Sequence, residues 1–359
     1  MADSKQAPLD AAAAAKAAFA SVQDKSFPDD IFTAPELRWA VIGCGVIANQ
    51  MAQSLSLAGR KLTGVANRTL SKAQAFAEQY GIEKVYETVE DLYADPDIDA
   101  VYITTPHNTH ITYLRAALAA GKHVLCEKAI TLNSAELDEA RAIADEHNVV
   151  LMDATTVLHM PLYQELRRRM DAGEFGRMNL AQLNFGSYKE YGDLTNRFYN
   201  RNLAGGAMLD IGVYALSVMR LFMASQPIEV VSLGNTCETG VDVAGGIVCR
   251  NAEQQLGVVS LTLHSKQPKR SIISFDKCYI EVNEYPRADH ATIVWTADGH
   301  REEVAAGTEA YALCYEMADL EKAVAGDDSK RELLGYASDV MELMTKLRAD
   351  WGVVYPEEE

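Results

Sequence analysis

The 359-residue chain is too long for one ordinary domain, and its 48% hydrophobic and 23% charged residues exclude a disordered protein. Its formal net charge of −18 argues against a surface that binds nucleic acid or an anionic membrane. The six cysteines form no CxxC pair and no His-Cys cluster at zinc spacing, so we expect reduced thiols, no metal site and a cytoplasmic protein.

Residues 1–35 are set apart by an alanine run at 11–15 and by Pro28 and Pro35. The segment carries acidic residues and lacks the bulky apolar stretch of a secretory signal. We therefore expect an alanine-rich arm that is docked on the body, docked on a partner subunit, or frayed. No apolar run approaches the roughly 18–20 residues that span a bilayer, so no membrane contact is expected.

An apolar strand that begins at Trp39 leads into a glycine-spaced turn and then into helix-forming sequence. Gly43, Gly45 and Ala48 have the spacing of the dinucleotide fingerprint. Gly43 permits the tight turn, Gly45 lets the backbone approach a pyrophosphate, and the small Ala48 lets the helix pack on the strand. The N–H groups that begin the helix point at the phosphates. The cofactor contacts expected here are Gly43, Gly45, Val46 and Ile47.

A second apolar strand ends at Ala66, about 20 residues further on, where the residue that reads the ribose belongs. NAD sites usually carry Asp or Glu there, whereas this chain reads Asn67-Arg68-Thr69. Arg68 offers a planar guanidinium that fits a 2′-phosphate, and Lys72, one helical turn on, can face the same anion. The sequence therefore predicts NADP(H) as the cofactor, bound in part by Asn67, Arg68 and Lys72. The alternative is that Arg68 is a solvated loop residue.

Strands and helices alternate from residue 39 to about 155, which predicts an α/β lobe with a six-stranded, doubly wound parallel sheet, a Rossmann domain. Ligands bind beyond the carboxyl ends of such strands. The fourth strand runs into residues 105–110, and the fifth delivers Glu127 and Lys128. Without a third metal ligand nearby, two histidines in the first of these loops indicate helix capping or a cofactor-lining loop. The cofactor contacts expected here are Thr105, Pro106, His107, His110, Glu127 and Lys128.

The second half of the chain has a different pattern. A long strand at 178–187, a helical segment at 204–223 and six further strand candidates up to residue 296 predict an α+β domain with an open, mostly antiparallel sheet. One face of this sheet would carry helices, and the other would be free for a dimer partner or a lid. We divide the chain into an arm (1–35), a dinucleotide-binding domain (36–155), a substrate and oligomerisation domain (156–330) and a C-terminal helix and tail that pack back on the body (331–359).

Reactive side chains away from the fingerprint gather at Lys128, Asp210 and Tyr214. Asp210 and Tyr214 stand four apart on a predicted helix and so share a face. An alcohol–ketone interconversion needs a proton donor or acceptor beside the carbonyl. A free tyrosine has a pKa of about 10, so it requires a nearby cation such as Lys128 to act near neutral pH. We assign catalysis to these three residues, with a satisfied polar pair in a helix interface as the alternative for Asp210 and Tyr214.

Several motifs together resemble one family. They are GxGxxA after the first strand, Thr105-Pro106, Glu127-Lys128 and Gly205-Gly206-x-x-x-Asp210-x-Gly212-x-Tyr214. From about residue 38 to 355 the chain is similar to the glucose-fructose oxidoreductase, inositol dehydrogenase and MocA (Gfo/Idh/MocA) family, and most to its NADP-dependent branch of dihydrodiol and sugar dehydrogenases. The resemblance implies Lys128 near the nicotinamide, Tyr214 as acid–base, a small polyhydroxylated substrate, and a homodimer or homotetramer through the C-terminal sheet.

Two departures weaken the inference of the substrate. Ala129 stands where the family usually has proline, often after a cis bond. A non-proline cis bond costs about 2.5–4 kcal/mol, so we expect a trans peptide and a different aim for Lys128. Residues 156–160 lack a Trp-x-Arg-Phe-like stretch that related enzymes tend to carry. A pocket for the substrate ring is expected from Tyr188, Tyr191, Arg197, Phe198, Tyr199 and Asn200, and the alternative for some of these is packing between strand and helix.

The sequence thus predicts an NADP(H)-dependent oxidoreductase that transfers hydride between the nicotinamide and a secondary alcohol or carbonyl of a sugar, cyclitol or cyclic diol. One alternative is a non-catalytic NADP-sensing or scaffold protein, which Ala129 and the altered 156–160 segment favour. The retained Lys128, Asp210 and Tyr214 argue against it. A second alternative is a redox-neutral, glycoside-cleaving enzyme that holds its cofactor tightly.

Overall fold

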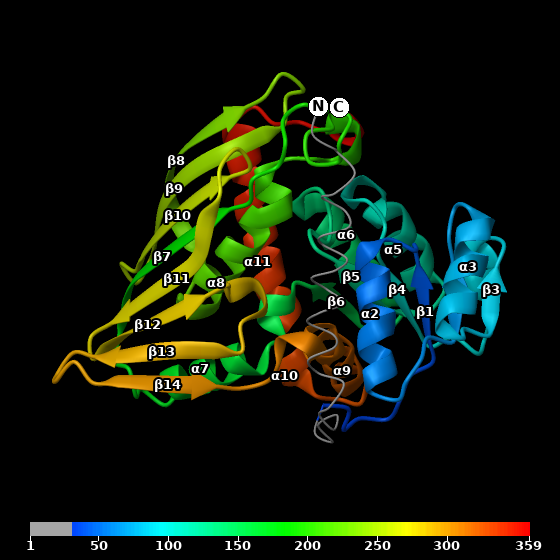
Figure 1. Ribbon diagram of the computed structural model, residues 1–359, viewed down its shortest axis with the longest axis horizontal. Helices are drawn as coiled ribbons and strands as arrows, with labels where there is room; N and C mark the ends of the chain where they lie inside the picture. The colour runs from blue at the N-terminus through cyan, green and yellow to red at the C-terminus, as the bar shows by residue number, and fades with distance from the viewer. Residues whose placement is uncertain (1–30) are drawn as a thin grey trace, which may run out of the picture.

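The computed structural model describes residues 31–359 as two lobes, each built on one sheet (Figure 1). Residues 1–30, most of the predicted arm, lie outside the described residues. The long helix α11 (Leu333–Asp350) runs between the lobes. The predicted combination of a Rossmann sheet and a second, mostly antiparallel sheet is confirmed. The predicted domain boundaries stay a prediction.

The first sheet has six parallel strands in the order β3-β2-β1-β4-β5-β6. Four of these strands, β1, β2, β4 and β6, are buried along their whole length, as expected for a parallel sheet that is covered on both faces. The strand order reverses between β1 and β4, which makes their carboxyl ends the binding edge. The strands are β1 (Trp39–Ile42), β2 (Gly64–Ala66), β3 (Lys84–Tyr86), β4 (Ala100–Ile103), β5 (His123–Glu127) and β6 (Leu151–Ala154).

The helices of this lobe begin and end where local sequence favours it. Thr88 caps α4 by accepting a hydrogen bond from the backbone N–H of Asp91, at 3.1 Å, and Asn133 caps α6 in the same way. Helix α3 ends at Gly81, whose φ of 66° suits glycine. The helices are α2 (Val46–Leu57), α3 (Leu70–Tyr80), α4 (Val89–Ala94), α5 (His110–Ala119) and α6 (Ser134–Glu146).

A helix from the far end of the chain completes the first lobe. Helix α9 (Ala312–Val324) packs Met317 into the cluster that contains Trp39. Its Glu321 carboxylate is buried and accepts hydrogen bonds from Trp39 Nε1 at 3.0 Å and from the guanidinium of Arg60 at 2.6 Å. One face of the parallel sheet therefore owes part of its core to residues beyond 310.

The second sheet has eight strands in the order β14-β13-β12-β11-β7-β10-β9-β8, and only the β7–β10 pair is parallel. Strand β14 was not predicted, because its sequence Arg-Glu-Glu-Val-Ala is mostly charged and it lies at the edge. The strands are β7 (Met178–Gly186), β8 (Pro227–Thr236), β9 (Asp242–Asn251), β10 (Leu256–Thr262), β11 (Gln267–Phe275), β12 (Cys278–Asn283), β13 (His290–Trp295) and β14 (Arg301–Ala305).

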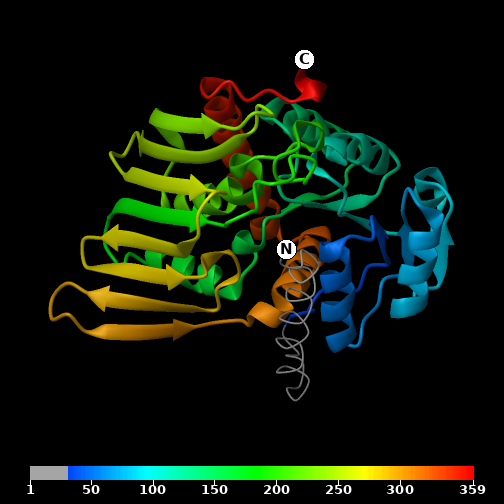
Figure 2. The ribbon, with the colours of Figure 1, turned by 45° about the horizontal axis from the view of Figure 1, so that its top comes forward.

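Helices cover the inner face of this sheet, which is turned toward the first lobe (Figures 1 and 2). At the β8–β9 end of the sheet, the Trp351 indole packs against the inner face. It occupies the space that side chains would take at Gly234 and Gly245, which are paired across the two strands. A Cβ built at these glycines would come within 2.2 Å and 2.3 Å of the indole, so both positions require glycine. The remaining helices are α7 (Pro161–Asp171), α8 (Val213–Phe222) and α10 (Asp328–Arg331).

One helical segment within residues 31–359, Arg201–Phe222, is long and apolar enough to cross a membrane. The expectation that no apolar run approaches this length is therefore wrong. Of the apolar window in this segment, 78% is buried inside the fold, which is the pattern of a core helix.

Candidate active site

The glycine turn after β1 has the geometry that a bound dinucleotide needs. Gly43 has a φ of +102°, and a Cβ there would lie 2.7 Å from Thr104 Oγ1 at the end of β4. Gly45 is exposed and has no atom within 4 Å of the position that its Cβ would take. Helix α2 begins directly after it, at Val46. The turn therefore leaves its backbone open to a pyrophosphate at the N-terminus of a helix.

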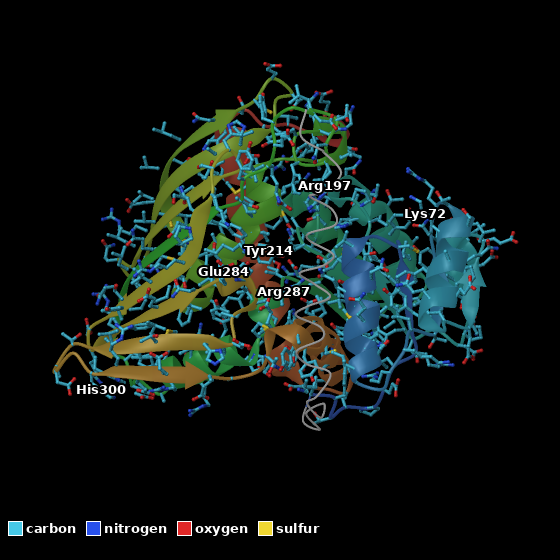
Figure 3. The ribbon with its side chains drawn as sticks, viewed as in Figure 1. Lys72, Arg197, Tyr214, Glu284, Arg287 and His300 are labelled. Carbon is cyan, nitrogen blue, oxygen red and sulfur yellow. The ribbon has the colours of Figure 1, made fainter. Side chains whose placement is uncertain are left out.

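The segment after β2 presents two unpaired basic side chains beside this turn. Arg68 and Lys72 are exposed, and neither side chain makes a hydrogen bond or ion pair with another residue of 31–359. Asn67 lies between β2 and α3 and donates a hydrogen bond to the Thr69 carbonyl at 3.0 Å. Burial raises the pKa of Cys44 in the glycine turn to about 11, and the charge of Lys72 opposes this shift, so Lys72 lies close to the turn. In the view of Figure 3, Lys72 lies at the upper end of α3, in the first turn of the helix.

The loop after β4 acts mainly on the backbone around Lys128. The two ring nitrogens of His107 contact the carbonyls of Ala204, at 3.3 Å, and Lys128, at 3.1 Å. Those of His110 contact the carbonyls of Ala129, at 3.0 Å, and Thr105, at 2.8 Å. Burial lowers the pKa of His107 to about 3 and also lowers that of His110, so both rings are neutral. The loop after β4 thus holds the Lys128–Ala129 peptide through the imidazoles of His107 and His110.

The described residues contain no group of His, Cys, Asp and Glu that could hold a metal ion. Thr105 accepts a hydrogen bond from Thr109 Oγ1 at 2.8 Å, and the Pro106 ring is exposed.

The Lys128–Ala129 peptide bond is cis. The expectation of a trans peptide is therefore wrong. The carbonyls on either side of the bond face the imidazoles of His107 and His110, and Ala129 itself is fully buried. The expectation of a trans bond was based on Glu127-Lys128-Ala129 alone, and the two histidines lie outside that motif.

Lys128, Asp210 and Tyr214 come together where the two lobes meet. The Lys128 ammonium donates to the Asp210 carbonyl at 2.6 Å and to its carboxylate at 3.3 Å. The same ammonium lies 4.7 Å from the centroid of the Tyr214 ring. Lys128 arrives from the end of β5, whereas the other two residues lie on a π-helical turn (Met208–Gly212) and on α8. The predicted contact between Asp210 and Lys128 is present.

Burial and neighbouring charges set the protonation states of Asp210 and Tyr214: the aspartate is ionised and the tyrosine is protonated. Burial opposes ionisation of Asp210, but the charges of Lys128 and Arg197 outweigh it and lower the pKa of Asp210 to about 2. Burial raises the pKa of Tyr214, and the charge of Lys128 offsets only part of the rise. The expectation that Lys128 brings the pKa of Tyr214 toward neutrality is therefore wrong, because burial of the phenol dominates.

Glu127 lies behind this group and is nearly buried. Its carboxylate accepts a hydrogen bond from the Tyr102 hydroxyl and one from the backbone N–H of Lys128, the latter at 3.2 Å. Burial raises the pKa of Glu127. Glu127 thus holds the backbone of Lys128 in place.

Asp242 supports the helix that carries Asp210 and Tyr214, and the sequence reasoning missed it. Its buried carboxylate accepts a hydrogen bond from the backbone N–H of Met208, at 2.6 Å, at the start of the π-helical turn. A Cβ at Gly206 would lie 2.3 Å from Asp242 Oδ1. The glycine pair in the motif was a usable signal, since it marks a close approach of another segment.

The six expected pocket residues divide into two groups. Arg197 reaches Asp210, at 3.4 Å, and its guanidinium lies 4.3 Å from the Phe198 ring centroid. Tyr199 is fully buried and donates to the Lys189 carbonyl, so it packs the loop. Asn200 caps the short turn η3 (Arg201–Leu203). Tyr188 and Tyr191 are exposed by 61% and 37%, and the Tyr191 ring lies against Tyr199 and His264.

The altered segment 156–160 lies beside a different cavity. His159 in this segment is buried, contacts Asp319 at 3.1 Å and lines the cavity together with Gln164 and Lys322. Lys128, Asp210 and Tyr214 do not line it. The segment therefore does not join the catalytic group directly.

A glycine-turn Rossmann lobe with a lysine, an aspartate and a tyrosine at its binding edge defines a nicotinamide-dependent oxidoreductase. Residues 37–155 match the family model described as an oxidoreductase family with an NAD-binding Rossmann fold, and residues 163–281 match the GFO/IDH/MocA C-terminal domain. The chain belongs to the Gfo/Idh/MocA family, and its cofactor is a nicotinamide dinucleotide. The predicted family is confirmed.

Relatives and solved structures agree with this assignment. The trans-1,2-dihydrobenzene-1,2-diol dehydrogenase of Xenopus tropicalis is 32% identical over 251 residues, which cover 68% of this chain and 74% of the relative. The enzyme of the same name from Sus scrofa is 28% identical, with 90% and 99% covered. A 3-ketoreductase from Actinomadura kijaniata, solved with NADP and TDP-benzene, has a TM-score of 0.75 at 25% identity over 88% of this chain and 98% of its own. Levoglucosan dehydrogenase, solved with NADH and levoglucosan, shares the fold with a TM-score of 0.75 at 19% identity over 86% and 97%.

Proposed function

We propose that this protein is an NADP(H)-dependent dehydrogenase that moves hydride between the nicotinamide and a secondary alcohol or carbonyl of a sugar, cyclitol or cyclic diol. The observation that carries the proposal is the Lys128 ammonium held by Asp210 over the ring of Tyr214. The enzymes named among the relatives act on a dihydrodiol, and the solved structures include sugar enzymes. The bound nicotinamide supplies or accepts the hydride.

Three residues divide the remaining work in this proposal. Tyr214, whose pKa burial raises, is protonated and donates its proton to the carbonyl oxygen during reduction. Lys128 is a fixed cation beside the oxygen on which negative charge develops. Asp210 holds the Lys128 ammonium and thereby orients it.

The proposed function is tested by a screen of sugars, cyclitols and cyclic diols with NADP and with NAD. We expect the absorbance of reduced nicotinamide to rise with at least one compound and NADP. Absence of any absorbance change across the screen, in either direction of the reaction, would leave a sensing or scaffold protein. Release of a sugar without net change in absorbance would identify the redox-neutral, glycoside-cleaving alternative.

The preference for NADP is proposed to rest on Arg68, with Lys72 and Asn67 beside it. Replacing Arg68 with Ala is expected to lower the preference for NADP over NAD by about 10- to 150-fold, since a charged hydrogen bond contributes about 1.5–3 kcal/mol. The measurement is the ratio of kcat/KM for the two cofactors. Arg115→Ala, at an exposed arginine on α5 that pairs with Glu139, is the control and should keep the ratio. An unchanged ratio in Arg68→Ala would make Arg68 a solvated loop residue.

The outer face of the C-terminal sheet supports a homodimer or homotetramer. Val231 on β8 pairs with Val248 on β9, which pairs with Val258 on β10, so all three share one face. Val231 is 75% exposed, and Leu233 beside it is 83% exposed. Figures 1 and 2 show no element of residues 31–359 over this face. An apolar surface of this kind marks a protein contact, and a second copy of the chain is the proposed partner.

Replacing Leu233 with Lys is expected to dissociate this oligomer into monomers, because the interface would then bury an unpaired charge. Sedimentation velocity measures the state. Glu83→Lys on the first lobe, where Glu83 pairs with Lys61 at an exposed site, should leave the oligomer intact. A wild-type protein that sediments as a monomer would contradict the proposal.

A cytoplasmic location is proposed from the cysteines. All six are free and form no disulfide. Such usage is typical of a reducing compartment.

A further inference from the structure

Basic side chains surround the catalytic group in excess of the acidic ones, although the chain as a whole carries a net charge of −18. Besides Lys128, they come from the loop after β7 and from the turn η5 (Tyr285–Arg287). Within residues 31–359, the carboxylates of Asp210, Glu127 and the buried Glu316 act on these cations, and burial raises the pKa of the last two. Glu284, which Figure 3 shows beside Tyr214 and Arg287, pairs with Lys269 at 2.8 Å. The basic side chains are Lys189, Arg197 and Arg287.

Lys189 and Arg197 share one aromatic platform and one carboxylate. The Lys189 ammonium lies 4.2 Å from the centroid of the Phe198 ring, and it makes no hydrogen bond or ion pair with another residue of 31–359. Arg197 contacts the Asp210 oxygen that already receives Lys128, at 3.4 Å and 3.3 Å. Burial lowers the pKa of Lys189, as do the charges of Arg197 and Lys128, whereas Asp210 raises it. The single negative charge of Asp210 therefore interacts with three cations, Lys128, Arg197 and Lys189, and can neutralise only one of them.

Arg287 brings a further cation from the second lobe. It is half-buried, and its guanidinium makes a single polar contact within residues 31–359, at 3.3 Å with the side-chain amide of Gln50 on α2. Its charge acts on Tyr214 and Glu127, which places it beside the catalytic group. In the view of Figure 3, Arg197 and Arg287 lie on either side of Tyr214.

We propose that the substrate carries an anionic group, a carboxylate or a phosphate, which Lys189 and Arg197 bind while the neighbouring hydroxyl is oxidised. This inference rests on the proposed function. Lys189 is half-buried and has no counter-charge of its own, which is costly unless a ligand supplies one. The exposed Arg197 shares the Asp210 carboxylate with Lys128, so the two cations together raise the local concentration of anions. The guanidinium of Arg197 matches the two oxygens of a carboxylate or phosphate.

The basic residues proposed for the cofactor, Arg68 and Lys72, follow β2 in the first lobe, whereas Lys189 and Arg197 lie in the loop after β7. Arg287 contacts Gln50 in the first turns of the helix that follows the glycine turn, so a cofactor could also reach it. The experiment therefore varies Lys189 and Arg197, not Arg287.

The test compares matched neutral and anionic sugars with saturating NADP. The pairs are glucose with glucuronate, galactose with galacturonate, and glucose with glucose 6-phosphate, so that the carboxylate and phosphate arms are separate. We expect kcat/KM to be at least about 10-fold higher for the anionic member of a productive pair and to fall with added salt. Lys189→Met and Arg197→Gln should each reduce this preference about fivefold or more through KM. Lys61→Met and Arg115→Gln, at exposed ion pairs of the first lobe, are the controls and should keep it.

Calorimetric titration of glucuronate and of inorganic phosphate into the NADP-loaded protein gives a readout that does not depend on turnover. We expect binding of at least one probe, weakened about 10-fold or more in the Lys189→Met, Arg197→Gln double variant. Equal or better turnover of the neutral sugars would overturn the inference and leave the proposed function standing. No turnover of any pair would count against the proposed function, and the titration would still decide the inference. Absence of probe binding, or variants that change only the KM for NADP, would overturn the inference.

Discussion

Replacing Tyr214 with Phe is expected to lower kcat by about 10²- to 10⁴-fold, which is the usual contribution of general acid–base catalysis. The substitution removes only the hydroxyl and keeps the ring that lies 4.7 Å from the Lys128 ammonium. The affinity for NADP should therefore stay the same. The measurement is kcat, by absorbance of reduced nicotinamide, together with the Kd for NADP by fluorescence titration.

Tyr113→Phe provides the matched control. Tyr113 lies on α5 of the first lobe, is partly buried and contacts neither Lys128 nor Asp210. It should leave kcat unchanged. Near-normal turnover in Tyr214→Phe would remove the acid–base assignment and transfer attention to Lys128 or to a water molecule.

Replacing Arg348 with Met is expected to lower the free energy of unfolding by about 3–5 kcal/mol. The substitution leaves the Glu358 carboxylate and the carbonyls of Leu132 and Val353 without their hydrogen-bond donor. The Arg348 side chain on α11 is only 2% exposed. It donates to Glu358 at 2.7 Å and to the Leu132 carbonyl at 2.6 Å, and so ties α11 to the loop after β5 and to the C-terminal turn. The hydroxyl of Tyr355, at the start of the C-terminal turn, donates a hydrogen bond to the Gly205 carbonyl at 2.7 Å, next to the helix that carries Asp210 and Tyr214.

The loss should appear as a lower midpoint of urea unfolding at neutral pH. Arg115→Met removes an arginine whose ion pair is exposed, so its effect should stay below about 0.5 kcal/mol. An effect of the same small size in Arg348→Met would contradict the structural role given to the buried guanidinium.

Local patterns were sufficient for the architecture of both lobes. The first sheet followed from apolar runs bounded by Gly43 and Gly81 and from the alternation of strands and helices, because such signals depend on residues that are near in sequence. The meeting of Lys128 with Asp210 was also predicted, from the opposite charges of the two side chains and their place in the motifs, although Asp210 comes from a π-helical turn of the second lobe.

Features that depend on distant segments were not predictable in this way. The cis peptide before Ala129 is flanked by His107 and His110, and the helix of Tyr214 is capped by Asp242 from β9. The raised pKa of Tyr214 depends on burial that only the packed structure creates. Each histidine lies 19 or more residues from the carbonyl that it contacts beside the cis bond, and Asp242 lies 34 residues from Met208, so the spacing within a short motif carries no information about them.

The position of α9 determines the order in which the chain can finish folding. The cluster around Trp39 lacks Met317, and the Trp39 and Arg60 side chains lack the Glu321 carboxylate, until synthesis has passed residue 324. A nascent first lobe would leave the ribosome with one apolar face only partly covered, and the gap would stay open while the entire eight-stranded sheet is translated. The N-terminal half is therefore a poor candidate for expression as a separate fragment.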